Sequence, residues 1–178
     1  ESNQSRGWEY RELFPSLIQE WRRHFGKADL PFLFVQISTQ MAPFKEANKQ
    51  SSHAELRESQ EVAAKTLPKV GMVTAIDLGD DDHDIHPKNK RKVGERLSNL
   101  ALYQVYAKEN FRPLAICPAF KRLDILDDKI IIELSDSHGL HTADGQPPAN
   151  FQIAGKDRIY HWAKANIDGE RLMVWAPG

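Results

Sequence analysis

The chain has 178 residues, of which 40% are hydrophobic and 28% are charged, enough for one sizeable core or for one core with a small satellite domain. Its formal net charge of −1 gives no electrostatic case for nucleic acid or an anionic membrane as a partner. No stretch approaches the roughly 18–20 apolar residues of a membrane-spanning helix. Cys117 is the single cysteine, so no disulfide can form within the chain.

The first predicted elements are an amphipathic helix at residues 8–25 and a short strand at residues 31–37. We expect the apolar face of the helix to consist of Leu13, Leu17, Ile18, Trp21 and Phe25. Arg22 is expected on the solvated face, and Pro15 either opens the helix or kinks it. The strand is short and continuously apolar, which is typical of a strand covered on both faces.

A second helix and strand follow. Ser51 or Ser52 is expected to cap a helix that runs to about Leu67, with Glu55 completing a capping box and Pro68 ending the helix. Residues 70–76 predict a second buried strand, 77–84 an acidic loop and 88–108 a third helix. Alternating helices and strands predict parallel pairing with right-handed crossovers, and a functional site at the carboxyl ends of the strands.

The pattern changes after about residue 112, where period-2 alternation replaces helical spacing. Five short strands are predicted, at residues 120–126, 129–134, 150–154, 158–165 and 171–175. We therefore divide the chain into an α/β part at 1–112 and a β-sandwich-like C-terminal domain at 113–178. The abrupt ending at residues 176–178 suggests that a closing strand is missing from this domain.

The tetrapeptide Asp84-Ile85-His86-Pro87 carries the strongest chemical signal. A carboxylate two or three residues before a histidine, on a loop stiffened by proline, can orient the imidazole to accept a proton from a serine hydroxyl. Without context such a loop is more often a solvated turn. Its place between a predicted buried strand and a basic helix favours the catalytic interpretation.

Several short motifs occur in order along nearly the whole chain. They are Glu1-Ser2-Asn3; residues 10–18 with Trp21-Arg22; Leu56-Arg57-Glu58 with Gln60; residues 85–90 with Val93-Gly94 and Arg96-Leu97; Gly139-Leu140; Asp144-Gly145; Phe151 with residues 153–157; and Ala163 with Ala165. In combination they resemble the sialate O-acetylesterases of the SGNH hydrolase superfamily. The resemblance implies an α/β fold, namely a partial flavodoxin-like three-layer parallel sheet followed by a small all-β domain. It also implies hydrolysis of acetyl esters on sialic acid or related sugars.

The resemblance assigns a Ser-His-Asp mechanism to particular positions. It makes His86 the general base and Asp84 the carboxylate that orients it. The superfamily often places the aspartate three residues before the histidine, where this chain has His83, so Asp82 is an alternative orienting carboxylate. Asn3 is implied as the donor to the developing oxyanion, a role worth about 3 kcal/mol.

The remaining members of that first segment, Glu1 and Ser2, are implied to lie at the oxyanion or substrate-binding site. The family's nucleophilic serine belongs to an upstream Gly-Gln-Ser-Asn segment, which this sequence lacks. Ser2 is a weak substitute, because its family position orients rather than attacks. We therefore expect an incomplete hydrolase that needs a complementary N-terminal segment or chain carrying the serine.

An O-acetylated sugar is the expected substrate, and no cofactor is expected. A secreted, periplasmic or lysosome-like location is implied by the resemblance. The main alternative is a non-catalytic carbohydrate-binding or interaction fragment, with Tyr160, His161, Trp162 and Trp175 as a sugar-stacking platform, although such aromatics are more often core.

Two further alternatives stay open. The run Asp80, Asp81, Asp82, His83, Asp84 and His86 has ligands suited to a divalent cation. The basic run Lys88, Lys90, Arg91 and Lys92 has the charge of a nucleic-acid patch, although such a run on a helix is more often a solvated face.

Overall fold

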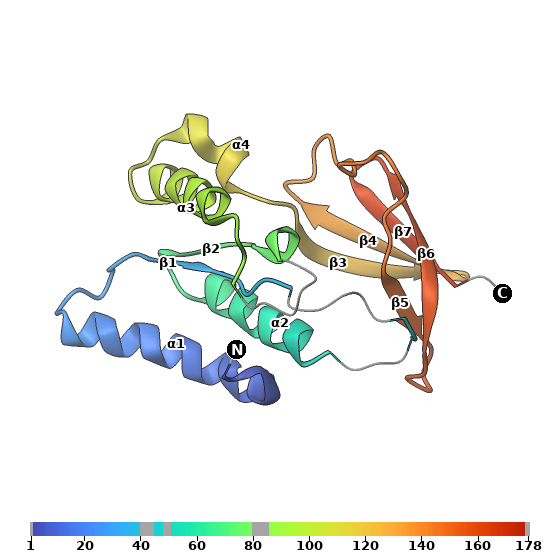
Figure 1. Ribbon diagram of the computed structural model, residues 1–178, viewed down its shortest axis with the longest axis horizontal. Helices are drawn as coiled ribbons and strands as arrows, with labels where there is room; N and C mark the ends of the chain where they lie inside the picture. Colours follow the sequence, from blue (N-terminus) through green and yellow to red (C-terminus); the bar gives the residue numbers. More distant parts are fainter. Residues whose placement is uncertain (1, 40–44, 48–50, 80–85, 177–178) are drawn as a thin grey trace. The chain divides into compact units, whose positions relative to one another are not determined.

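The computed structural model describes residues 2–39, 45–47, 51–79 and 86–176. The chain divides into two compact units. The first consists of Glu1–Ala42 and Ser51–Ala115, and the second of Pro43–Gln50 and Ile116–Gly178. Helices and a parallel strand pair make up the first unit, and an antiparallel sheet makes up the second (Figure 1). None of the helices in the described ranges combines the length and the hydropathy that a membrane span requires.

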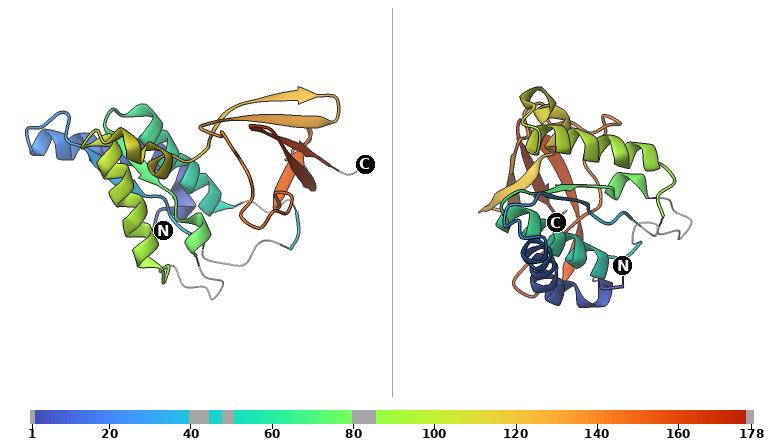
Figure 2. Two further views of the ribbon diagram at one scale, coloured as in Figure 1. Left: turned by 90° about the horizontal axis from the view of Figure 1, so that it is seen from above. Right: turned by 90° about the vertical axis from the view of Figure 1, so that its left-hand side faces the viewer.

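Two parallel strands form the middle layer of the first unit. Strand β1 (Phe32–Val35) pairs with β2 (Val70–Val73), so that Phe32 lies opposite Val70 and Val35 opposite Val73. Helix α3 (Lys90–Gln104) covers one side of this pair, and α2 (Ser52–Thr66) with α1 (Gly7–His24) covers the other, as Figures 1 and 2 show. The predicted parallel pairing is confirmed.

Helix α1 follows a short 3-10 helix, η1 (Gln4–Arg6), and continues through Pro15 without opening there. Its inner face is not the predicted one. Ile18 is fully buried and the ring of Phe14 makes an edge contact with Phe34 at 4.8 Å between centroids. Four of the five residues expected on the buried face are instead roughly half exposed, namely Leu13, Leu17, Trp21 and Phe25.

Arg22 also departs from its predicted place on the solvated face, because it is only 6% exposed. Its guanidinium donates from Nε to the carbonyl of Leu30 at 3.0 Å and from Nη2 to the carbonyl of Pro68 at 2.7 Å. These carbonyls lie just before β1 and β2. Burial of this cation is therefore offset by hydrogen bonds that tie α1 to the starts of both strands.

Helix α2 begins one residue after its cap, Ser51, whose hydroxyl accepts a hydrogen bond from the amide of Ala54 at 3.2 Å. The predicted capping box is wrong, because Ala54 and not Glu55 occupies the position three residues after the cap. The helix ends at Thr66, two residues before Pro68.

The predicted third helix is shorter than expected. Asn89 caps α3, since its side-chain oxygen accepts from the amide of Lys92 at 3.0 Å. After α3 the chain forms a 3-10 turn, η3 (Glu109–Phe111), and a short helix, α4 (Arg112–Ala115). Strand β2 is also shorter than predicted, because a 3-10 turn, η2 (Ile76–Leu78), follows it.

The second unit is a curled five-stranded antiparallel sheet with strand order β3-β4-β7-β6-β5. Its strands are β3 (Ala119–Leu126), β4 (Lys129–Ser135), β5 (Phe151–Ala154), β6 (Tyr160–Asp168) and β7 (Arg171–Trp175). The first half of β6 pairs with β5 and its second half pairs with β7. All five strands predicted from the sequence are confirmed.

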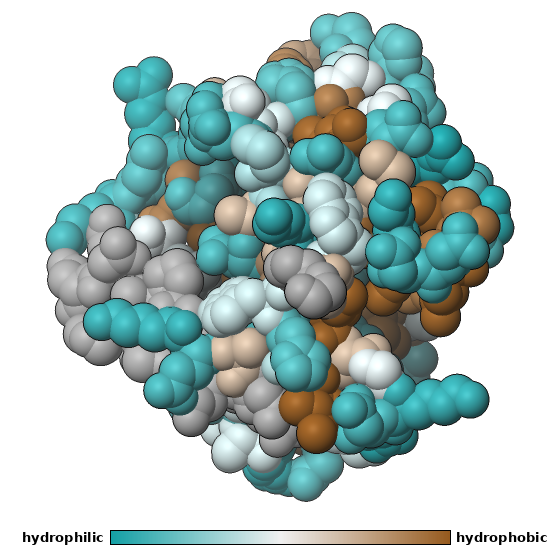
Figure 3. Space-filling model, turned by 90° about the vertical axis from the view of Figure 1, so that its right-hand side faces the viewer, coloured by the Kyte–Doolittle hydropathy of each residue, from teal (hydrophilic) through white to brown (hydrophobic). Residues whose placement is uncertain are grey.

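The buried residues of this sheet are small and aliphatic. Ala165 and Val174 are fully buried, whereas Trp162 is 36% and Tyr160 is 47% exposed. The core interpretation of these two aromatic residues is therefore wrong. The space-filling view in Figure 3 shows apolar surface between hydrophilic side chains.

Candidate functional site

A pocket of about 180 Å³ opens in the first unit at the carboxyl ends of the two parallel strands. Its described lining consists of Val35, Gln36, Ile37 and Ser38 at the end of β1, Ala75 after β2, and Pro87, Lys90 and Val93 at the start of α3. Ligands of open parallel sheets bind outside the carboxyl ends of their strands. The pocket thus lies where the alternation of helices and strands predicts a functional site.

The end of β1 is fixed by hydrogen bonds to α2. The backbone amide of Gln36 donates to Val73 at 2.8 Å, and its side-chain amide donates to the carbonyl of Arg57 at 3.1 Å. The next amide, of Ile37, donates to Oε1 of the buried Gln60 at 3.1 Å. This wall of the pocket is therefore held in place by main-chain and side-chain hydrogen bonds before any ligand arrives.

Arg57 lies behind the same wall. Its Nη1 is 3.5 Å from the carbonyl oxygen of Ser38, which is itself a lining residue. Partial burial lowers the pKa of the Arg57 guanidinium by desolvation. Within the described ranges no ion pair joins this guanidinium to a carboxylate. A half-buried positive charge therefore stands next to the pocket without a described counter-charge.

The segment after β2 is fixed to α3 by an ion pair. Arg96 donates to both carboxylate oxygens of Asp77 at 2.6 Å, and its Nη1 also donates to the carbonyl of Thr74 at 2.8 Å. The hydrogen bonds from Arg96 hold the pKa of Asp77 below its usual value. Ala75, which lines the pocket, lies between these two anchored residues.

Gly79 allows the ends of the two strand segments to come together. A Cβ atom at this position would collide with Oγ1 and the carbonyl of Thr39. The Oγ1 of Thr39 in turn donates to the carbonyl of Ile76 at 3.2 Å. The chain therefore needs a residue without a side chain where it leaves the pocket toward the acidic loop.

His86 is exposed and directly precedes Pro87, which lines the pocket. The carboxylates predicted to orient it, Asp84 and Asp82, lie outside the described residues. Most of the acidic run that was considered as a metal site lies there too. In the part of the chain that the structure describes, no group of three or more potential ligands is suited to hold a metal ion. The orienting role of either aspartate stays a prediction.

Asn3 is half-buried and lies immediately before η1, where its carbonyl accepts a hydrogen bond from the amide of Arg6 at 2.9 Å. Ser2 is exposed, and Glu1 lies outside the described residues. The described pocket lining includes Pro87 but not Asn3. The structure thus places the neighbour of His86 at the pocket, and the predicted oxyanion role of Asn3 stays a prediction.

Three polar residues of the pocket were missed by the sequence analysis, namely Gln36, Ser38 and Lys90. Gln36 and Ser38 lie at the end of a strand that the sequence predicts to be buried, although the residues of β1 are all half-buried. Lys90 was assigned to a solvated basic run. Its helical position alone does not distinguish it from Arg91 or Lys92, because only the fold shows which of these cations belongs to the pocket lining.

Comparisons with known proteins agree with this architecture. The family model described as carbohydrate esterase, sialic acid-specific acetylesterase, matches residues 1–103. The mouse (Mus musculus) sialate O-acetylesterase is 29% identical over 175 residues, covering 89% of this chain and 31% of that protein. A crystal structure of a carbohydrate acetylesterase from Xanthomonas citri has a TM-score of 0.83 and 36% identity, covering 96% of this chain and 38% of that chain.

The chain spans about a third of the length of both relatives. The family match extends over more than half of the chain and includes every described residue of the pocket. The chain belongs to the carbohydrate esterase family of sialic acid-specific acetylesterases.

Proposed function

We propose that the protein removes O-acetyl groups from sialic acid or a related acetylated sugar, and that this chain supplies the acid–base part of the active site. The observation that carries the proposal is the pocket at the strand ends, which lies within the matched family region and whose wall includes the residue after His86. In this proposal the layers α2, β1–β2 and α3 are part of a flavodoxin-like SGNH sheet. Their parallel pairing supports that assignment.

The proposed reaction begins with His86 accepting the proton of a serine hydroxyl, which a segment outside this chain supplies. The serine oxygen attacks the acetyl carbonyl, and the side-chain amide of Asn3 donates a hydrogen bond to the oxyanion that forms. The imidazolium of His86 then protonates the departing sugar oxygen. Water, activated by the same imidazole, releases acetate from the serine. Asp84, or alternatively Asp82, orients the ring.

The walls of the pocket suit such a substrate. Val35, Ile37 and Val93 give it an apolar side that can contact the acetyl methyl group or a sugar ring face. Gln36 and Ser38 contribute polar groups among these apolar residues. A few polar groups in a largely apolar pocket are typical of small-molecule sites, where they fix the orientation of the ligand.

The test is acetate release from O-acetylated N-acetylneuraminic acid by the protein with its flanking segments present. We expect release, together with covalent labelling by a fluorophosphonate at a serine outside residues 1–178. Label on Ser2 would contradict the proposed origin of the nucleophile. Absence of acetate release from both the acetylated sialic acid and an aryl acetate would refute the esterase function.

A second candidate function, non-catalytic carbohydrate binding, is favoured by the exposure of Tyr160 and Trp162. These residues alternate along β6 and therefore present their rings on the same face of the sheet. If this face binds glycan, Trp162→Ala abolishes binding of a sialylated oligosaccharide in isothermal titration, whereas Trp8→Ala, which removes an exposed tryptophan of the first unit, leaves it unchanged. Equal binding by both variants would contradict this function.

A further inference from the structure

Lys90 is the charged residue among the described residues that line the pocket. The other seven are apolar or neutral: Val35, Gln36, Ile37, Ser38, Ala75, Pro87 and Val93. Lys90 is the first residue of α3 and its side chain is exposed. Lys90 is therefore the source of charge on an otherwise uncharged described wall.

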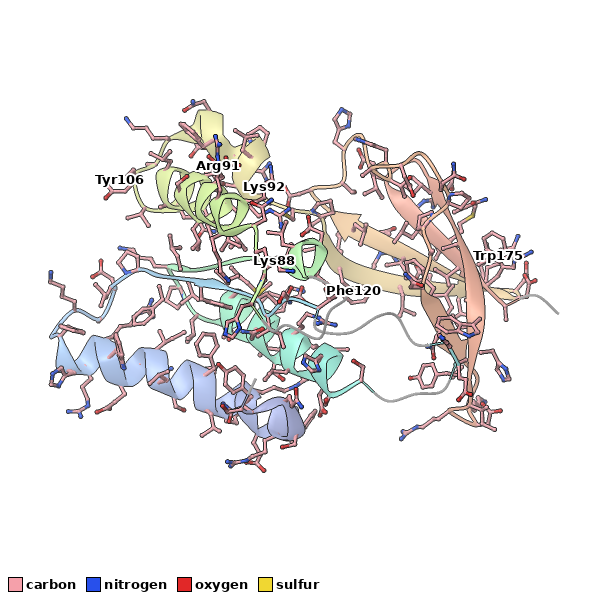
Figure 4. The ribbon with its side chains drawn as sticks, in the orientation of Figure 1. Lys88, Arg91, Lys92, Tyr106, Phe120 and Trp175 are labelled. Atoms are coloured by element: carbon pink, nitrogen blue, oxygen red, sulfur yellow. The ribbon has the colours of Figure 1, made fainter. Side chains whose placement is uncertain are left out.

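The cations that follow Lys90 on α3 are already paired. Nε of Arg91 lies 3.0 Å from one carboxylate oxygen of Glu95, and Nζ of Lys92 lies 3.7 Å from the other. Arg96 pairs with Asp77 at 2.6 Å. By contrast, no ion pair joins Lys90 to any carboxylate in the described ranges. Figure 4 labels Arg91 and Lys92 on α3, and neither lines the pocket.

Arg57 adds a second positive charge near the pocket, because its Nη1 lies 3.5 Å from the carbonyl oxygen of the lining residue Ser38. It is partly removed from water, and no carboxylate in the described part of the chain pairs with it. Nearby charges act more strongly on one another where protein displaces solvent. The described surroundings of the pocket therefore favour a ligand that carries a negative charge.

We propose that Lys90 is a specificity-determining residue that recognises the carboxylate of an acidic O-acetylated sugar. The proposal rests on the esterase function proposed above and adds to it the residue that pairs with the negative charge of the substrate. A lysine ammonium offers three donors and acts as a compact point charge, so it can pair with a carboxylate in several orientations. Lys90 takes no part in the acyl transfer itself.

The experiment compares two substrates that differ only in charge. One is O-acetylated N-acetylneuraminic acid and the other is the same acetylated sugar with its carboxylate converted to a carboxamide. Acetate release is measured for the protein with its flanking segments present. We expect Lys90→Gln to raise KM for the acid roughly tenfold, the effect of losing one hydrogen bond to a charged group. KM for the amide and kcat for both substrates stay unchanged.

Two further variants make the result specific. Lys90→Arg keeps the charge and restores most of the affinity for the acid. Lys92→Gln removes the same charge from the same helix outside the pocket and leaves both KM values unchanged, which excludes a general effect of net charge on encounter. If Lys90→Gln changes KM equally for both substrates, or for neither, the proposed role of Lys90 is wrong. The esterase function would still stand. If the unmodified protein releases no acetate from either substrate, both the role of Lys90 and the esterase function are refuted.

Discussion

Arg96 and Asp77 join helix α3 to the segment that follows β2 through two hydrogen bonds of 2.6 Å. The same guanidinium also holds the carbonyl of Thr74. Ala75 of the pocket lies between Thr74 and Asp77, so one arginine fixes both flanks of a lining residue. The ion pair connects the packing of α3 with the shape of the proposed site.

This pair predicts a particular dependence of stability on pH. Hydrogen bonding from Arg96 lowers the pKa of Asp77 below its usual 3.8. The stabilisation is therefore present above pH 3.8 and is lost as the pH falls through the lower pKa of the folded state. We expect the urea midpoint of the wild-type protein to fall more steeply below pH 4 than that of Asp77→Asn.

Arg96→Met serves as the matched variant for this prediction, because it removes the other member of the pair. Its urea midpoint is expected to show the same flatter profile at acid pH, and the double variant is expected to add nothing further. Parallel profiles for the wild-type protein and Asp77→Asn would contradict the assignment of this acid sensitivity to the pair.

Gly79 and Gly94 are expected to respond in opposite directions to substitution by alanine. A Cβ at Gly79 collides with the carbonyl of Thr39, whereas nothing lies within 4 Å of a Cβ at Gly94, in α3. Gly79→Ala should lower the melting temperature and acetate release together, because the backbone must shift beside the pocket. Gly94→Ala should stabilise the protein by about 0.5–1 kcal/mol. A Gly79→Ala variant with the melting temperature and acetate release of the wild-type protein would show that the close approach of Gly79 to Thr39 is not needed.

Arg22 is expected to contribute far more to stability than its neighbour Arg23. Arg22 is buried and donates to two backbone carbonyls, whereas Arg23 is exposed and pairs with Glu20 on the surface. Arg22→Met should cost about 1.5–3 kcal/mol in the free energy of unfolding. Arg23→Met should cost much less, because an exposed ion pair contributes little to stability. Equal costs in urea titrations would contradict the anchoring role of Arg22.

The sequence predicts the second unit better than the faces of the first helix. The turns at residues 127–128 and 169–170 separate strands of clear period-2 character, so local signals suffice to place β3, β4, β6 and β7. In α1, apolar residues occur on more than one face, and Arg22 is buried only because distant carbonyls accept its hydrogen bonds. Such long-range partners leave no local pattern.

The place of the pocket was predictable, but its composition was not. Alternating helices and strands put it at the carboxyl ends of β1 and β2, where His86 had already drawn attention. Identifying Gln36, Ser38 and Lys90 as lining residues required the register of β1 and the rotation of α3 about its axis, which periodicity fixes only approximately. Asp82 and Asp84 stay candidates from the sequence.

The turnover number of His86→Ala on O-acetylated N-acetylneuraminic acid tests whether His86 is the general base of an acetylesterase. His138→Ala is the control, because it removes a fully exposed histidine of the second unit. Loss of the base should lower kcat at least about 10²-fold, with an unchanged melting temperature, while the control keeps wild-type turnover. Wild-type turnover in His86→Ala would contradict the proposed mechanism.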